Sequence, residues 1–522
     1  MGARRIFLNV AATYGRSLIA LICGLFTGRW ALAALGERDF GLWVLISGLG
    51  AFVVFLNGLM GLSVSRFYAY AIGERSLRNS QRLGLEDVRR WFCAALVTHC
   101  VLACILVAIG YPVGRYLISH WLEIPAERVG DCVKAFGFVC LSCWTGMVSV
   151  PFSAMYSARQ NIAEFSLYGF AQTAVHFFLL WYAVYNPQDW FIPYVAWISL
   201  MTLAVNVISS FVAVWKFPEC RLPAHATDIG ERIHRLGAYA LWQFFGGFGS
   251  LARTQGLNVL VNRMFGSAMN ASYGVSQHVQ SQAQGLSAAF IDALTPVVTT
   301  VCGAGAKDAF IRNSMRVSRI GGVLAMMLTI PLVLEMGDVL RLWLVTPPPQ
   351  SQCICFCVLV SLLIDRMTSG QKLALNAYGR IAAYQISVGC ILAATLPFAW
   401  FLARIGMGFR AVGYALVAGS VLAGLGRVFF ARRVLGFGIA DWLRNVMLPV
   451  MSLGALAIVI GLMPRLVIPV GLCQLAATML LSGLTVAVCA WWIVFDDDER
   501  RGACNVLMRV FARNADPKVR PE

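Results

Sequence analysis

One long apolar stretch of the chain carries four polar side chains at a helical spacing. Within residues 359–380, four polar side chains follow one another at intervals of four, three and four residues: Asp365, Ser369, Lys372 and Asn376. Side chains at that spacing share one face of an α-helix. Asp365 and Lys372 lie two turns apart, about 10 Å along the axis, which is too far for a direct ion pair. Each charge therefore needs a partner from another segment, from water or from a ligand.

Basic residues inside other apolar stretches favour the binding of an anion. No residue nearby in the same predicted helix clearly neutralises Arg16, Arg253 or Lys372. An arginine guanidinium matches the geometry of a phosphate, and a lysine adds a point charge. We therefore predict an anionic head group as ligand, with binding residues Arg16, Arg66, Arg253 and Lys372. Near span ends, Arg29, Arg66 and Arg263 can instead reach the membrane interface.

Two carboxylates inside apolar stretches, Asp292 and Asp365, are candidates for binding a coupling ion, because a buried carboxylate can titrate or coordinate. For Asp365 the alternative is a structural ion pair with a neighbouring span. The polar residues that we expect to line a cavity are Asn57, Thr254, Asn258, His278, Ser369 and Asn376. We predict no metal and no cofactor, because the pair Cys140 and Cys143 lacks a second pair or a histidine cluster.

The elements that position these residues are membrane helices. The chain of 522 residues is 59% hydrophobic and 13% charged, far from the composition of a soluble domain. Counting apolar runs of about 20 residues predicts an all-α polytopic membrane protein with fourteen transmembrane helices at approximately 8–34, 40–71, 91–112, 131–155, 165–185, 191–215, 239–262, 271–300, 317–337, 353–376, 384–403, 411–431, 445–463 and 468–494.

The net charge of +17 follows the loops. One set of loops, together with both ends of the chain, holds about 27 of the 42 Lys and Arg residues, which predicts that both termini are cytoplasmic. This pattern favours topology over nucleic-acid binding as the reason for the basic composition. The outer loops are all short, which argues against a glycan polymerase or ligase, since such an enzyme presents catalytic groups outside the membrane. We expect no enzymatic activity.

The two halves of the chain resemble one another. The segment "LGERDFGLW" (35–43) precedes "GER" (73–75), and "FGSAMNASYG" (265–274) precedes "GAK" (305–307) at almost the same distance. Six spans separate the copies, so the repeat is parallel, with its pseudo-twofold axis along the membrane normal. We predict a six-helix lobe at 1–216, a cytoplasmic linker at 217–238, a second six-helix lobe at 239–433, two additional helices within 434–495 and a cytoplasmic tail at 496–522.

These segments, the "hLhhWL" pattern after the third and ninth spans, and the doubled six-span unit with two extra helices resemble the multidrug/oligosaccharidyl-lipid/polysaccharide superfamily. Within it the chain looks like the polysaccharide-transporter (Wzx-type) flippases. The resemblance implies alternating access and translocation of an undecaprenyl-pyrophosphate-linked oligosaccharide across the bacterial inner membrane for cell-surface polysaccharide synthesis. Implied partners are this lipid-linked substrate, membrane lipids, and a polysaccharide polymerase with its chain-length machinery. The alternatives are an ion-coupled small-molecule exporter of the same superfamily and a membrane glycan polymerase or ligase.

Overall fold

The computed structural model describes residues 3–77, 81–159, 161–221, 228–303, 307–344, 346–378, 382–469, 471–495 and 500, and in these ranges it contains helices and no strand. The prediction of an all-α membrane fold is confirmed. The helices are α1 (Ala3–Leu77), α2 (Gln81–Tyr116), η1 (Leu117–Trp121), α3 (Ala126–Ala158), α4 (Ile162–Tyr185), α5 (Phe191–Lys216), η2 (Pro218–Cys220), α6 (Ile229–Gly303), α7 (Lys307–Leu334), α8 (Met336–Leu344), α9 (Ser351–Met367), α10 (Ser369–Tyr378), α11 (Ala382–Leu402), η3 (Ala403–Met407), α12 (Arg410–Leu435), α13 (Ile439–Trp442), η4 (Leu443–Met447), α14 (Leu448–Leu462), α15 (Pro464–Val467) and α16 (Leu472–Ile493).

The two longest helices are each broken at one glycine. Both α1 and α6 have 75 residues, and the breaks lie at Gly36 (φ 73°) and Gly266 (φ 81°). Glycine alone adopts such positive φ values without a steric cost from a side chain. The two glycines occupy the same place in "LGERDFGLW" and "FGSAMNASYG", as a duplicated unit would require. Each break divides its helix into two arms.

The chain is a multi-pass membrane protein. Ten described helices are long and apolar enough to cross a membrane, or up to eleven if the pair α9 and α10, bent by 47°, forms one span. The predicted fourteen would add a second span in α1 and two in α6. Large apolar side chains such as Trp215 and Phe211 are 79% and 73% exposed, which suits lipid as the surrounding solvent.

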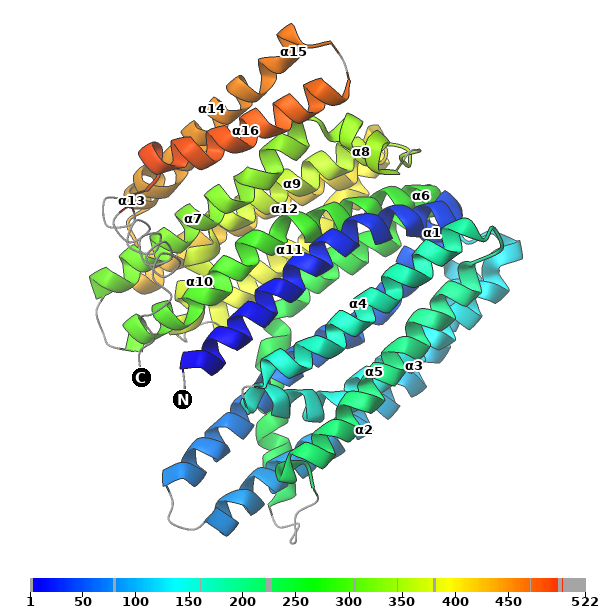
Figure 1. The fold of residues 1–522 in the computed structure, drawn as a ribbon, viewed down its shortest axis with the longest axis vertical. Coiled ribbons are helices and arrows are strands. Elements are labelled where there is room, and N and C mark those ends of the chain that lie inside the picture. Colours follow the sequence, from blue (N-terminus) through cyan, green and yellow to red (C-terminus); the bar gives the residue numbers. More distant parts are fainter. Residues whose placement is uncertain are drawn as a thin grey trace, which may run out of the picture. The chain divides into compact units, whose positions relative to one another are not determined.

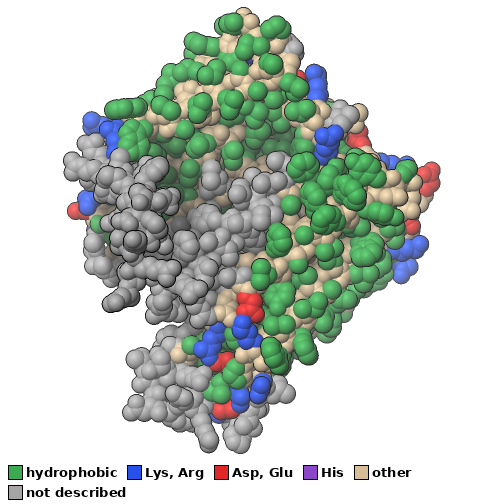
Figure 2. Space-filling model, in the orientation of Figure 1, with side chains coloured by type: hydrophobic (Ala, Val, Ile, Leu, Met, Phe, Trp, Pro, Cys, Tyr) green, Lys and Arg blue, Asp and Glu red, His purple; other side chains and the backbone are tan. Residues whose placement is uncertain are grey.

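The helices divide into two compact units, the first made of residues 1–285, 340–358 and 385–419 and the second of 286–339, 359–384 and 420–522. Each unit contains segments that lie close together in space, whereas each predicted lobe contains one copy of the sequence repeat. The two divisions differ, so the lobe boundaries stay a prediction. On the first unit, Figure 2 shows hydrophobic side chains over the middle of the visible face and charged side chains toward its ends.

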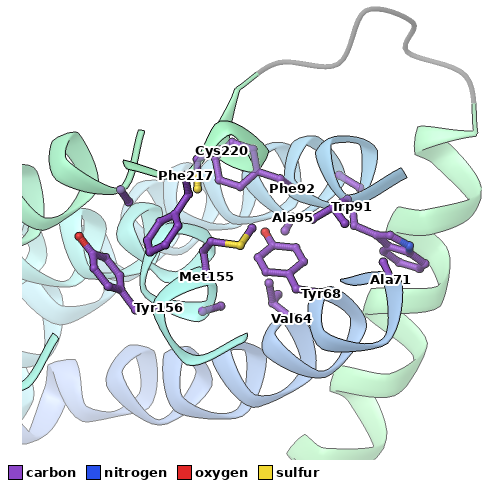
Figure 3. Packing of buried hydrophobic residues seen from close by; sticks show 14 of the residues in the cluster. Val64, Tyr68, Ala71, Trp91, Phe92, Ala95, Met155, Tyr156, Phe217 and Cys220 are labelled. Atoms are coloured by element: carbon purple, nitrogen blue, oxygen red, sulfur yellow. The ribbon is translucent and has the colours of Figure 1, made fainter. Parts of the chain in front are cut away.

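In the first unit α3 packs against α1, α2 and α5, and α4 packs against α1 and α5 (Figure 1). One core cluster joins the ends of α1, α2, α3 and α5, where Tyr68, Phe92 and Tyr156 are at most 1% exposed (Figure 3). The Tyr156 hydroxyl donates a hydrogen bond of 3.1 Å to the Ser209 carbonyl. This core fixes the relative positions of the helices that line the cavities described below.

In the second unit α7 contacts α10, α14 and α16. Ser318 of α7 joins α7 to α10, because its Oγ accepts a hydrogen bond from the Gly370 amide and donates one to Gln371 Oε1, each 2.8 Å long. A Cβ at position 370 would lie 1.7 Å from the Ser314 carbonyl oxygen. The backbones of α7 and α10 therefore approach more closely than any residue but glycine allows.

We expect Gly370→Ala to lower the free energy of unfolding by about 1–3 kcal/mol, because the added methyl group forces two helix backbones apart. The measurement is the thermal unfolding midpoint of the purified protein in detergent. Gly110→Ala is the matched control, since a Cβ there has no atom within 4 Å, and it should leave the midpoint unchanged or raise it slightly. Equal midpoints for Gly370→Ala and wild type would contradict the close approach.

Candidate functional site

The second arm of α1, residues 37–77, borders three cavities of the first unit. The largest, about 860 Å³, is called the arginine cavity, because Arg263 and Arg404 line it. The second, about 610 Å³, is called the hydroxyl cavity and is lined largely by serines. The third, about 220 Å³, is called the amide cavity and contains Gln255, Asn258 and Gln277. None of the residues that line these three cavities is an aspartate or a glutamate.

The arginine cavity combines apolar walls with two cations. Its walls come from α1, η1, α6 and α11 and include Phe52, Trp121, Phe248 and Trp400. Arg404 lies over the Trp400 ring, 5.5 Å from the ring centroid, at a distance typical of a cation–π contact. Apolar walls with a few polar groups are typical of sites for small molecules. This arrangement suits a ligand that is part apolar and part anionic.

A short segment after η1 is fixed to the end of the first arm of α6. Arg263 forms an ion pair with Glu123. The neighbouring Asn262, fully buried, accepts a 3.0 Å hydrogen bond from the Glu123 amide and donates one of 3.2 Å to the Glu123 carbonyl. Because the carboxylate of Glu123 already neutralises Arg263 in part, the cavity offers one strongly paired arginine and one arginine stacked on a tryptophan.

The amide cavity lies between the second arm of α1 and both arms of α6. Thr254 and Asn258, two of the residues predicted to line a cavity, lie four residues apart on one helical face and line it together. Asn258 is 3% exposed and donates a 3.0 Å hydrogen bond to the Val44 carbonyl. Ser47 lines both this cavity and the hydroxyl cavity, and Gly48 lines both this cavity and the arginine cavity. The amide cavity therefore shares a wall with each of its neighbours.

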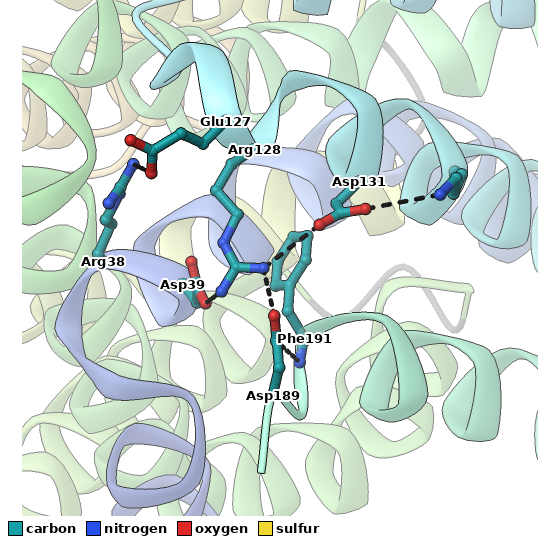
Figure 4. A network of polar contacts seen from close by, with 8 residues as sticks. Arg38, Asp39, Glu127, Arg128, Asp131, Asp189 and Phe191 are labelled. Atoms are coloured by element: carbon teal, nitrogen blue, oxygen red, sulfur yellow. Dashed lines mark hydrogen bonds and ion pairs between the residues drawn. The ribbon is translucent and has the colours of Figure 1, made fainter.

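At one end of the first unit, Arg128 joins three carboxylates (Figure 4). Its guanidinium donates to Asp189 at 2.5 Å, to Asp39 at 2.6 Å and to Asp131 at 3.3 Å. These residues come from the second arm of α1, from α3 and from the loop that precedes α5. The hydrogen bond from Arg128 lowers the pKa of Asp189. The network holds these segments together at the end of the bundle and lies outside all three cavities.

In the second unit, Asp365 has a partner that the sequence analysis did not identify. Arg427 of α12 donates hydrogen bonds to Asp365 at 2.8 Å and to the Thr368 hydroxyl at 2.9 Å. Arg427 is 6% exposed, so this is a buried ion pair between two apolar helices. This pair agrees with the alternative interpretation of Asp365 given above, a structural ion pair with a neighbouring span. A role of Asp365 in ion coupling stays a prediction.

The predicted site residues do not form one group. The side chains of Arg16, Arg66 and Asp292 lie outside the described residues. In the first unit, Asn57 lines the hydroxyl cavity and Thr254 and Asn258 the amide cavity, whereas Arg253 and His278 line none of the three.

His278 and Arg253 pack inside the first unit. His278 Nε2 lies 2.8 Å from the Gly24 carbonyl oxygen, and the imidazole stacks on the Trp343 ring with a centroid separation of 5.6 Å. Arg253 is 7% exposed. In the second unit, Ser369 Oγ donates to the Arg366 carbonyl at 2.8 Å, and Lys372 and Asn376 are exposed. The assignment of Arg253 and Lys372 to an anion site stays a prediction.

The sequence analysis missed Arg404, Arg427 and all the serines of the hydroxyl cavity. Arg404 and Arg427 lie within a turn or two of the predicted span ends, where arginines commonly extend to the interface. The serines follow a helical period that could have been noticed. Serine is also frequent wherever membrane helices pack closely, so this period alone does not distinguish a cavity from a helix contact.

No protein-family model matches this sequence, and no curated protein sequence matches it. Solved structures do. The chain aligns over 93% of its length with 99% of a chain described as "Lipid II flippase MurJ, inward closed conformation", at a TM-score of 0.66 and 10% identity. It aligns over 81% of its length with 94% of an inward-facing multidrug resistance MATE family transporter of the MOP superfamily, at a TM-score of 0.58 and 14% identity.

A third similar structure is a MOP superfamily transporter from Pyrococcus furiosus, described by the words "Reverse polarity of binding pocket suggests different function". It covers 83% of this chain and 94% of its own, with a TM-score of 0.52 and 14% identity. At these identities the likeness shows a shared fold. The predicted fold is therefore confirmed, and the superfamily and its Wzx-type branch stay predictions.

Proposed function

We propose that a chain with this fold and these cavities is a flippase for an undecaprenyl-pyrophosphate-linked oligosaccharide. It would move this lipid from the cytoplasmic to the outer leaflet of the bacterial inner membrane by alternating access, with both termini cytoplasmic. The observation that carries the proposal is the charge of the cavities: two arginines and no carboxylate line them. A pyrophosphate group gains charge-assisted hydrogen bonds from guanidinium groups.

The shape of the arginine cavity supports an amphiphilic substrate. The two arginines lie near the ends of α6's first arm and α11, which the charge distribution of the loops assigns to the outer side of the membrane. The apolar walls that extend from them would accept part of a lipid chain or a hydrophobic neighbour of the phosphate. The Arg263–Glu123 ion pair would open as the pyrophosphate replaces the carboxylate at the guanidinium.

A multidrug-type exporter is the competing function, since the MATE structure shares the same fold. Lipophilic drug cations need carboxylates or aromatic faces to replace their hydration. The described cavities offer tryptophan and phenylalanine rings but no carboxylate, and Arg263 and Arg404 would repel such a cation. A glycan polymerase or ligase would need catalytic groups outside the membrane, where the predicted loops are short.

The proposal is tested by reconstituting the protein into liposomes that contain a fluorescent undecaprenyl-pyrophosphate-linked oligosaccharide, and by measuring its transfer between leaflets. We expect transfer by the wild type and a rate at least about tenfold lower for Arg263→Gln combined with Arg404→Gln, because each guanidinium provides a charge-assisted hydrogen bond. Arg115→Gln is the matched control, an arginine at the end of α2 outside the cavities.

Two results would contradict the proposal. Transfer of a lipophilic cation such as ethidium, with none of the lipid-linked oligosaccharide, would identify an exporter. Equal transfer rates for the double variant and the wild type would remove the arginine cavity from the path of the substrate. In that case the predicted anion ligands Arg16, Arg66, Arg253 and Lys372 would be the next to replace by alanine.

A further inference from the structure

The hydroxyl cavity is polar without carrying a charge. Its lining includes eight serines, one threonine and two asparagines, with no lysine, arginine, histidine, aspartate or glutamate. Its volume of about 610 Å³ lies within the range of about 300–1,000 Å³ that is usual for ligand sites. An anion would meet no cation in this cavity, and a cation would meet no carboxylate. The lining therefore favours a neutral ligand that forms many hydrogen bonds.

Three helices line this cavity with side chains that recur at helical spacing. On the second arm of α1 the lining residues run from Trp43 to Ser65, and similar stripes occupy α3 and α5. The distance from Trp43 to Ser65 corresponds to about 33 Å of helix, close to the roughly 30 Å of the hydrocarbon core. The cavity is thus an elongated track that follows the second arm of α1, with room for an extended ligand.

The hydroxyl groups of the track are mainly acceptors. Each of several side chains donates its proton to a carbonyl of its own helix, as Ser153 Oγ does to Val150 at 3.0 Å and Ser142 Oγ does to Phe138 at 3.2 Å. The oxygen lone pairs stay available for a second partner. A ligand that donates hydrogen bonds, as the hydroxyl groups of a sugar do, complements such a surface.

Two carboxamides beside Gly146 add donors and acceptors. A Cβ at Gly146 would lie 3.3 Å from Asn57 Nδ2 and 3.9 Å from Asn206 Nδ2. Ser149 Oγ lies 3.3 Å from Asn206 Oδ1. Asn57 Oδ1 is buried and has no hydrogen-bond partner among the described residues, so a small rotation of its amide group would offer that oxygen to a ligand. Buried polar groups of this kind usually find a partner.

We infer that the hydroxyl cavity binds the uncharged, hydroxyl-rich glycan of the transported molecule. The inference rests on the proposed function and divides the substrate between two faces of one helix arm. The pyrophosphate meets the arginine cavity, lined by Gly48, Leu49 and Phe52, and the sugars meet the hydroxyl cavity, lined by Ser47, Asn57 and Gly58. Specificity for the glycan then resides in hydrogen bonds, and affinity for the lipid resides in charge and apolar contact.

The test compares two lipids that differ only in the sugar: undecaprenyl diphosphate and the same diphosphate carrying a neutral trisaccharide. Their dissociation constants are measured with the full chain in nanodiscs. The variant is Gly58→Leu, because Gly58 lines the cavity and a Cβ there meets no atom within 4 Å. Gly110→Leu is the matched control, a helical glycine of α2 with equally open space.

We expect the wild type and Gly110→Leu to bind the glycosylated lipid about tenfold more tightly than the bare lipid. A few net hydrogen bonds to the sugar provide a difference in binding free energy of this size. Gly58→Leu should lose this preference and keep its affinity for the bare lipid. The pair Asn57→Leu and Asn206→Leu should act in the same way.

Three outcomes would overturn the inference. Equal affinities of the wild type for the two lipids would show that the sugar has no site. If Gly58→Leu lost affinity for both lipids equally, this face of α1 would have a structural role. If Gly58→Leu keeps the full preference, the sugar binds elsewhere. Absence of binding of the bare lipid to the wild type would instead refute the proposed flippase and, with it, the inference.

Discussion

Replacement of Arg427 by methionine is expected to lower the free energy of unfolding by about 3–5 kcal/mol, the usual cost of removing one partner of a buried ion pair. The side chain of Arg427 is 8% exposed, and its hydrogen bonds to Asp365 and Thr368 are 2.8 and 2.9 Å long. Methionine fills a similar volume but leaves the Asp365 carboxylate without its guanidinium. In the apolar part of a membrane helix, a carboxylate that loses its guanidinium partner is costly.

A double-mutant cycle separates this pair from the rest of α12. Thermal unfolding in detergent is measured for Arg427→Met, Asp365→Leu and the double variant, and the double variant should recover most of the loss because no charge is left unpaired. Arg432→Met, at an exposed arginine of the same helix, should leave the midpoint nearly unchanged. If Arg427→Met melts like the wild type, the ion pair contributes nothing, and Asp365 returns as a candidate for ion coupling.

Replacement of Arg128 by methionine should lower the free energy of unfolding by on the order of 3 kcal/mol. Arg128 is the shared partner of Asp39, Asp131 and Asp189, and Asp39 is 8% exposed. Without the guanidinium, Asp39 is a buried carboxylate that faces other carboxylates of the same sign. Addition of Asp39→Asn to Arg128→Met should recover part of the loss by removing the buried charge.

Acidification provides an independent measure of the same network. The hydrogen bond from Arg128 lowers the pKa of Asp189, so this carboxylate stabilises the fold at neutral pH. That stabilisation is lost as the pH falls below the ordinary aspartate pKa of about 3.9 toward the lowered value. The corresponding acid sensitivity should be smaller in Arg128→Met, where the Phe191 amide is left to hydrogen-bond the Asp189 carboxylate. Lys134→Met is the control, because Lys134 is exposed and 3.7 Å from Asp131, and it should change neither the midpoint nor the acid response.

Composition and hydropathy were sufficient to predict the all-helical membrane fold, because both depend on local sequence. The predicted span boundaries also bracket the helix breaks, since Gly36 lies between spans 8–34 and 40–71 and Gly266 lies between spans 239–262 and 271–300. The partner of Asp365 could not be predicted in this way. Arg427 lies 62 residues further along the chain, and no periodicity relates two positions on different helices.

The cavities were predicted only in part for a similar reason. Thr254 and Asn258 could be predicted to line a cavity, because they lie four residues apart on one apolar helix. The hydroxyl cavity instead requires three stripes, from α1, α3 and α5, to face the same space. Each stripe alone is also what close helix packing would produce, so only the arrangement of the helices distinguishes a lined cavity from a tight contact.

The serines of the hydroxyl cavity have a consequence for the energy balance of the cell. A polar track about as long as the hydrocarbon core is thick could conduct protons if its hydroxyl groups and a chain of hydrogen-bonded waters could transfer them. Ser47, Ser142 and Ser209 each donate their proton to a carbonyl of their own helix, which fixes the hydroxyl orientation that a relay would have to reverse. No carboxylate or imidazole lines the track, and these are the groups on which proton relays in pumps depend. The same features that suit the track to a sugar therefore make it a poor proton wire, so under the proposed function a sugar would pass along it without discharging the proton gradient.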